Sequence, residues 1–95
     1  MKNKDGIHIY DEQDLVGIKK ACDIASETLD MMADLIEPGI TTVSLDNACH
    51  EFILSKNATP ATLGYRGYPK SCCISLNHVV CHGIPGDKKL KNGDI

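Results

Sequence analysis

Aromatic side chains are scarce in this sequence, which has one Phe, three Tyr and no Trp among its 95 residues. A hydrophobic core must therefore be built mainly from Leu, Ile, Val, Ala and Met. The length allows at most one small domain, and a chain of this size buries only roughly 60–65% of its surface on folding. We therefore expect marginal stability unless something further completes the core.

Excess basic charge and long apolar runs are also missing. The formal net charge is −3, and the one basic cluster, Lys88, Lys89 and Lys91, is typical of a solvated loop. This charge argues against nucleic acid as a partner, because phosphate binding needs a basic face. No apolar run approaches the roughly 20 residues that span a bilayer, and no apolar stretch follows the charged residues 1–6 as a secretory signal requires. We expect no membrane partner.

The sequence lacks a recognisable disulfide or zinc pattern. Its five cysteines are odd in number and fit no disulfide framework, which favours reduced thiols and a cytoplasmic location. No Cys-x-x-Cys pair occurs, so the Cys-His pairs at residues 49–50 and 81–82 do not indicate a structural zinc site. A thiol-based metal or redox module is kept as an alternative function. The cysteines are Cys22, Cys49, Cys72, Cys73 and Cys81.

Carboxylates are few in the second half of the chain, where only Asp87 and Asp94 follow Glu51. A dinuclear metal hydrolase needs several carboxylates that converge on its ions. This stretch therefore cannot supply such a site.

Two helices are predicted in the first half. Asp11 is a suitable N-cap with Asp14 three residues on, and Glu37-Pro38-Gly39 predicts the end of the first helix. A second helix is expected to begin near Thr42 or Ser44 and to fade at residues 56–57. The first helix has an apolar stripe with alternating spacings of three and four residues. The members of this stripe are Leu15, Ile18, Cys22, Ala25, Leu29, Met32 and Ile36.

The second half has the character of strands and tight turns. Residues 71–76 and 79–82 predict an antiparallel hairpin around residues 77–78. Ile95 follows a turn signal and is expected to begin a further strand. The fold class is therefore α/β, of the α+β type, with two amphipathic helices followed by antiparallel strands. Little within the chain would cover the long apolar stripe, so we expect a chain truncated at a strand start.

Three residues of the second half are candidates for chemistry. His82 ends a predicted strand, and near neutral pH its ring can donate or accept a proton or bind a metal ion. A histidine at a turn can equally play a structural role by forming a hydrogen bond with the backbone. Tyr65 and Tyr68 lie in a glycine-rich loop that can present aromatic faces to a ligand. They can equally anchor the loop on the core, and spacing alone leaves both alternatives open.

A long motif then suggests a family. Residues 63–85 read Leu-Gly-Tyr-Arg-Gly-Tyr-Pro-Lys-Ser-Cys-Cys-Ile-Ser-Leu-Asn-His-Val-Val-Cys-His-Gly-Ile-Pro. This run resembles the bacterial type I methionine aminopeptidases, and the segments at residues 38–46 and 90–95 fit the same pattern. The resemblance covers essentially the whole chain.

The resemblance implies an incomplete pita-bread (creatinase/aminopeptidase) fold, with residues 1–95 as the amino-terminal part of a single catalytic domain. It implies a methionyl aminopeptidase that removes the initiator methionine from nascent polypeptides, near the ribosome, when the second residue is small. The full-length form is expected to be a monomer. Two divalent ions (cobalt, manganese, iron or zinc) are implied, held by two Asp, one His and two Glu. The first of these ligands is expected beyond Ile95, so the chain alone is predicted to be inactive. The alternative is a non-catalytic binding module on the same fold.

The resemblance also implies roles for individual residues. His82 matches a histidine that contacts the substrate near the scissile peptide. Tyr65, Tyr68 and Cys73 match positions that line the pocket for the methionine side chain, and aromatic faces with a soft sulfur suit a thioether. Thr62 lies in the same pocket, where some relatives have Cys.

A monovalent-cation site is a separate implication of the resemblance. It would use Asn77 and the carbonyl of Val79.

Overall fold

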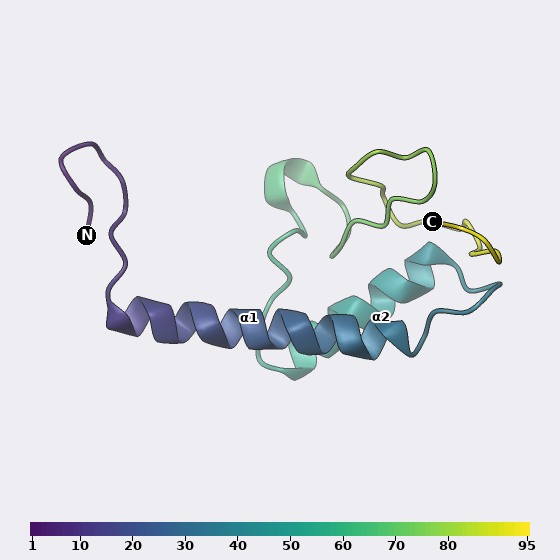
Figure 1. Ribbon diagram of the computed structural model, residues 1–95, viewed down its shortest axis with the longest axis horizontal. Coiled ribbons are helices and arrows are strands. Elements are labelled where there is room, and N and C mark those ends of the chain that lie inside the picture. Colours follow the sequence, from purple (N-terminus) through teal and green to yellow (C-terminus); the bar gives the residue numbers. More distant parts are fainter.

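The structure is a computed structural model that describes residues 1–95. It contains helix α1 (Glu12–Ala33), helix α2 (Thr42–Ser55) and a single 3-10 turn, η1 (Tyr65–Gly67), in that order. The two helices come first in the chain and the irregular second half folds over α2 (Figure 1). None of the helices has the length and apolar character needed to cross a membrane.

Helix α1 begins where its capping residues predict. Asp11 accepts a hydrogen bond from the Asp14 backbone N–H, and the Asp14 carboxylate accepts one from the Asp11 N–H in return. This reciprocal capping box satisfies two backbone donors that the helix cannot satisfy itself. The end predicted at residues 37–39 is wrong, because regular helix stops at Ala33 and the next turn tightens. The N–H groups of Leu35 and Ile36 donate three residues back instead of four.

Helix α2 is fixed at its start by the carboxy-terminal segment. The hydroxyl of Thr41 caps the Ser44 N–H, and the first-turn N–H groups of Thr42 and Val43 donate to the carbonyls of Lys88 and Gly86 at 3.0 and 2.8 Å. Residues 86–90 thereby satisfy backbone donors of the helix that would otherwise lack partners. This pairing brings the distant second half of the chain onto α2.

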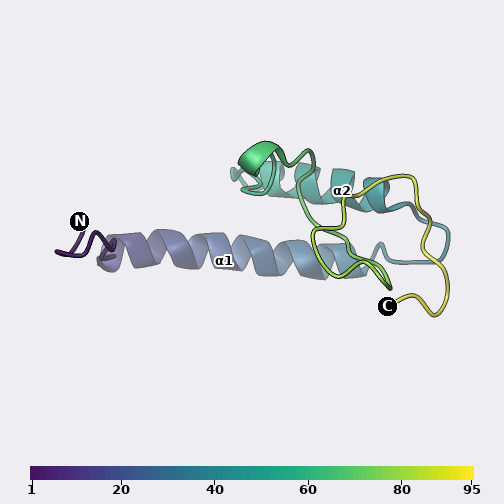
Figure 2. The same ribbon diagram turned by 90° about the horizontal axis from the view of Figure 1, so that it is seen from above.

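Helix α2 runs back along the carboxy-terminal half of α1, and the amino-terminal half of α1 extends beyond it (Figure 2). The inner face of α2 is apolar, with Leu45 2% and Cys49 4% exposed. On α1 the inner face carries Ile24 and Thr28 instead of the predicted stripe, and the buried Thr28 hydroxyl donates to the Ile24 carbonyl.

The apolar stripe of α1 stays uncovered, as expected from the sequence. Leu15 is 57%, Leu29 71% and Ile36 59% exposed. The radius of gyration is 16.2 Å, against roughly 12 Å for a compact domain of this length. Only seven of the 95 residues are buried, so the core is small and is centred on α2.

The predicted strands are wrong in this structure, which has isolated bridges between Lys2 and His8 and between Thr41 and Lys89 but no ladder. Residues 71–83 do turn back on themselves around Asn77. Two backbone hydrogen bonds join the two arms: the Val79 N–H donates to the Leu76 carbonyl across the turn, and the Ile74 N–H donates to the Gly83 carbonyl. The Gly83 N–H donates to the Ser75 hydroxyl instead of to a backbone carbonyl.

Backbone conformation explains why the hairpin does not become a ladder. His82 has a φ angle of 53°, a left-handed conformation that interrupts the predicted return strand. Asn77 has the same φ angle, but it lies in the predicted turn, where hairpins accept that conformation. Ile95 pairs with Asn77 through two hydrogen bonds, at 2.7 and 3.0 Å, and the strand expected to begin there stays a prediction.

The uncovered stripe predicts concentration-dependent self-association. We expect sedimentation velocity to show species larger than the monomer, because exposed apolar area of this extent favours association. Leu29→Gln should reduce the associated fraction several-fold. Val16→Gln is the matched control, since Val16 is 69% exposed but lies off the stripe. A single monomeric species with a sharp cooperative melt would contradict the prediction.

Candidate functional site

One pocket brings together all five residues predicted to bind substrate. It has a volume of about 640 Å³ and is formed by residues 62–69, by Cys73 and by residues 82–84. Segments separated by some 20 residues of sequence therefore meet around one space. The lining residues are Thr62, Tyr65, Arg66, Gly67, Tyr68, Pro69, Cys73, His82 and Ile84.

The aromatic side of the pocket is held by a tight turn. Gly64 and Gly67 have φ angles of 82° and 80°, which glycine adopts without steric cost. The Gly64 N–H donates to the Tyr68 carbonyl at 2.8 Å, and the Tyr68 N–H donates to the Tyr65 carbonyl at 2.9 Å. These bonds close the turn, so that both tyrosines border the same space while Tyr65 stays 64% exposed.

Tyr68 connects this turn to the opposite side of the pocket. Its hydroxyl lies 2.9 Å from the carbonyl of Cys72 and 3.2 Å from that of Gly83, and it can donate to either. Burial, followed by the neighbouring Cys73, raises the pKa of Tyr68 to about 12. The phenol is thus a neutral hydrogen-bond donor at physiological pH.

A buried carboxylate on α2 holds the loop that carries Cys73, which forms the third side of the pocket. Asp46, on α2 and 4% exposed, accepts hydrogen bonds from the backbone N–H groups of Ser71 and Cys72 at 2.8 and 3.0 Å. It also accepts a hydrogen bond from the Cys72 thiol, at 3.4 Å. The Ser71 hydroxyl lies 2.9 Å from Nδ1 of His50, one turn further along α2. The loop is therefore tied to the helix at two successive residues.

This attachment gives two adjacent cysteines different surroundings. Cys72 points back to Asp46, and burial followed by that carboxylate raises the pKa of its thiol well above the usual range. Cys73 lines the pocket and is exposed. A protonated, masked thiol thus anchors the loop while its neighbour faces the pocket.

His82 lies at the pocket's edge in the left-handed conformation described above. The next residue must be glycine, because a Cβ at Gly83 would clash with the Ile74 carbonyl. The two arms thus approach closely just beyond His82, which lines the pocket together with Tyr68 and Cys73.

Asn77 and Val79 do not line this pocket. The Asn77 side chain donates to Asp94 at 3.1 Å and accepts the Ile95 N–H at 3.0 Å. The Asn77 hydrogen bond and the Lys91 N–H together lower the pKa of Asp94. The structure thus gives Asn77 a loop-closing role, and the monovalent-cation site stays a prediction.

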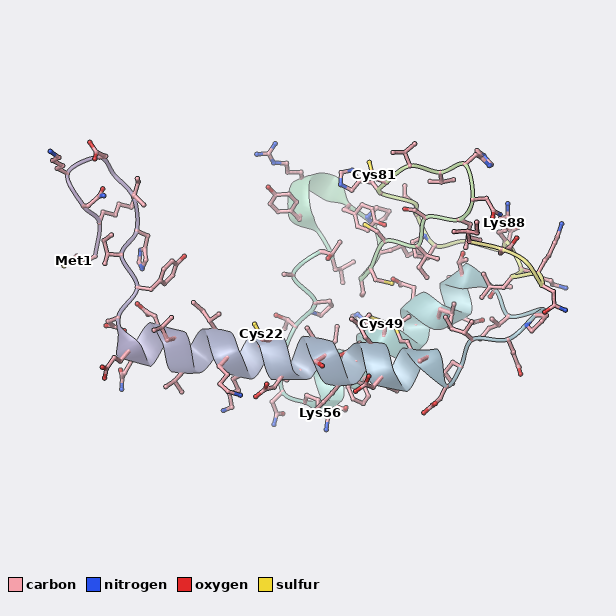
Figure 3. All side chains as sticks on the ribbon, viewed as in Figure 1. Met1, Cys22, Cys49, Lys56, Cys81 and Lys88 are labelled. Atoms are coloured by element: carbon pink, nitrogen blue, oxygen red, sulfur yellow. The ribbon has the colours of Figure 1, made fainter.

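No group of three or more His, Cys, Asp or Glu side chains converges anywhere in the structure. The residues of this chain therefore do not fit a divalent-metal centre on their own. The five cysteines are all unpaired, and Cys22, Cys49 and Cys81 lie in three separate places (Figure 3). This dispersal gives no support to a thiol-based metal module.

Sequence reasoning missed three residues of the site. Arg66 and Ile84 line the pocket, and both lie within the motif between residues already singled out, so proximity was the available signal. Asp46 was missed as an anchor, although an acidic residue beside Leu45 on the inner face of a helix is a recognisable sign of a buried acceptor.

The Asp46 anchor predicts a large loss of stability on truncation. Asp46→Ala leaves two buried N–H donors unpaired and should lower the free energy of unfolding by roughly 2–4 kcal/mol. Urea unfolding followed by circular dichroism measures this loss. Asp46→Asn retains an acceptor oxygen and should lose less.

Asp23→Ala is the control for that measurement. Its carboxylate pairs with Lys19 at the surface, so roughly 0–1 kcal/mol is expected. Equal losses for the Asp46 and Asp23 variants would contradict the anchoring role.

Tyr68 predicts an ionisation step at high pH. Because its folded pKa is raised from 10 to about 12, folding favours the neutral phenol. The associated stability is present below pH 10 and is lost as the pH rises through about 12. Phenolate absorbance should show a step near that upper value in the parent chain and not in Tyr68→Phe. A step that persists in the variant would rule out the assignment.

Comparison with known proteins agrees with the motif. The family model for metallopeptidase family M24 matches residues 16–95. The chain is 56% identical over 89 residues to a methionine aminopeptidase of Rickettsia prowazekii, covering 94% of this chain and 34% of that protein. It is 48% identical over 91 residues to a methionine aminopeptidase of Haemophilus influenzae, with the same two coverages.

Solved structures show the same similarity in three dimensions. The crystal structure of the methionine aminopeptidase from Rickettsia prowazekii gives a TM-score of 0.88 at 55% identity, covering 92% of this chain and 35% of that one. The enzyme from Thermotoga maritima gives 0.89 at 31% identity, covering 93% and 36%. The predicted pita-bread fold class is therefore confirmed. The chain spans about a third of the length of these relatives, in their amino-terminal portion, and it belongs to metallopeptidase family M24.

Proposed function

We propose that this chain forms the methionine-binding wall of a methionyl aminopeptidase, which removes the amino-terminal methionine of new polypeptides when the second residue is small. The observation that carries the proposal is the meeting of Thr62, Tyr65, Tyr68, Cys73 and His82 around one pocket. The similarity to methionine aminopeptidases over 94% of the chain supports it.

The chemistry of the wall suits a thioether side chain. Tyr65 and Tyr68 offer aromatic faces, and Cys73 offers a polarizable sulfur between them and His82. Sulfur–aromatic contacts of this kind contribute roughly 0.3–1.5 kcal/mol each. A lysine side chain would lose hydration, and its ammonium would meet the positive charge of Arg66 in the same pocket, so the wall favours methionine over lysine.

His82 is proposed to act on the peptide group next to the methionine. Its position at the pocket's edge, beside Tyr68 and Cys73, suits a ring N–H that donates to the scissile peptide while the side chain of methionine is inside. The fixed left-handed backbone at His82 limits the freedom of the ring and so favours this orientation.

Membership of a metallopeptidase family implies dependence on divalent metal. We propose that two ions, drawn from cobalt, manganese, iron and zinc, are held by residues outside this chain. The support is the lack of any converging ligand group within it. Nascent polypeptide amino termini near the ribosome are the proposed substrates and the cytoplasm the proposed location, in keeping with five unpaired cysteines.

Binding of methionine to the wall is directly testable. Nuclear magnetic resonance titration of the 95-residue chain with methioninamide should shift the amide signals of residues 62–69, 73 and 82–84, and lysinamide should not. Tyr65→Ala should weaken methioninamide binding roughly three- to tenfold.

Tyr10→Ala is the matched control for that titration. Tyr10 is 58% exposed, close to the 64% of Tyr65, but lies in the amino-terminal segment. Shifts that do not map to the pocket, or equal losses in the two variants, would refute the proposal.

The chain by itself is predicted to have no peptidase activity. With cobalt or manganese added, it should release no methionine from a Met-Ala peptide, because no set of side chains converges to hold an ion. Chromatographic detection of free methionine tests this. Turnover that disappears on metal chelation would show that the chain is catalytic alone.

A further inference from the structure

Arg66 lines the pocket, but the proposed function gives it no role. It is the one side chain among the nine lining residues that carries a permanent charge. It forms no ion pair, since the ion pairs of the structure join His8 to Asp14, Lys19 to Asp23 and Lys56 to Glu27. Its guanidinium makes no hydrogen bond within the chain either, so its donors are free.

The guanidinium is nevertheless held in place. Its central carbon lies 5.5 Å from the centre of the Tyr65 ring, in a cation–π contact. This contact uses none of the N–H groups in a hydrogen bond, so they stay available. Those groups form the donor fork that matches a carboxylate in two parallel hydrogen bonds.

The backbone at Arg66 adds to this fixed position. Its φ and ψ angles are 49° and 37°, a left-handed conformation that is unfavourable for any residue with a Cβ. The turn that imposes it is closed by hydrogen bonds on both sides, from Gly64 to Tyr68 and from Tyr68 to Tyr65. Glycine would fit this position without cost, as it does at Gly64 and Gly67 on either side.

Charge makes the position distinctive. The chain as a whole has a net charge of −3, yet the pocket contains no acidic residue, and its one permanent charge, on Arg66, is exposed to solvent. A carboxylate on a peptide that occupies the pocket can therefore reach a free cation without competition from an acidic side chain of the pocket.

We propose that Arg66 is a specificity-determining residue that binds a carboxylate on the peptide downstream of the methionine, so that the site prefers peptides with an early Asp or Glu. This inference rests on the proposed function, because it needs the methionine side chain in the pocket to bring the following residues past Arg66.

The test compares two amidated peptides that differ in one charge, Met-Ala-Asp-Ser-NH₂ and Met-Ala-Asn-Ser-NH₂, titrated into the 95-residue chain by nuclear magnetic resonance. At low salt the Asp peptide should bind roughly three- to tenfold more tightly, as expected for a charge-assisted pair at a partly exposed site. The preference should shrink in high salt, because screening weakens exposed pairs.

Three variants separate charge from turn geometry. Arg66→Gln should bind both peptides equally. Arg66→Gly should also lose the preference although it suits the left-handed backbone, whereas Arg66→Lys should keep part of it. Lys70→Gln is the matched control, since Lys70 is a nearby cation that does not line the pocket, and it should leave the preference intact.

The outcomes distinguish this inference from the proposed function. Equal binding of the two peptides by the parent chain, with shifts in the pocket, would overturn the role of Arg66 and leave the methionine pocket standing. A preference that survives in Arg66→Gln and Arg66→Gly would overturn it as well. Absence of binding by either peptide would overturn the pocket and the inference together.

Discussion

The carboxylate of Asp46 links the two halves of the molecule. It lies on α2, in the small core, and accepts the N–H groups of two successive loop residues, Ser71 and Cys72. The second half has no sheet of its own, so its position depends on this attachment together with the hydrogen bonds that join residues 86–90 to the start of α2. A buried carboxylate is costly unless its oxygens are paired. Here the pairing decides which cysteine turns inward and which faces the pocket.

The site and the long helix are nearly independent. The pocket is built from residues 62–84 and is supported by α2, while the free half of α1 extends away from both (Figure 2). The buried residues lie mainly on α2 and in the segments that contact it, and none of them lines the pocket. The exposed stripe of α1 contributes little to holding the pocket. Bigger domains are stabilised by a large core. This chain is stabilised instead by local turns, by the Asp46 carboxylate that accepts loop N–H groups, and by a few long-range hydrogen bonds.

The sequence predicts the features that depend on local chemistry. The Asp11–Asp14 capping box follows from residues close together in the chain. The lining of the pocket was predicted only through the family resemblance, because spacing alone left the roles of His82 and the two tyrosines open. The strands were predicted wrongly because an extended return strand depends on φ at His82, which propensity does not reveal. The inner face of α1 was missed because periodicity identifies apolar faces without showing which one is covered. The roles of the pocket residues stay predictions.

The residues with a left-handed backbone conformation limit how this chain could be made more stable. Apart from Asn57, which ends α2, the non-glycine residues with positive φ are Arg66, Asn77 and His82. Two of these line the pocket and the third closes the adjoining loop. Glycine would relax the backbone at each position, but only by deleting the side chain. Selection of this chain for thermal stability would therefore favour glycine at these positions and would weaken ligand recognition first. Consensus or computational stabilisation should leave these three residues unchanged.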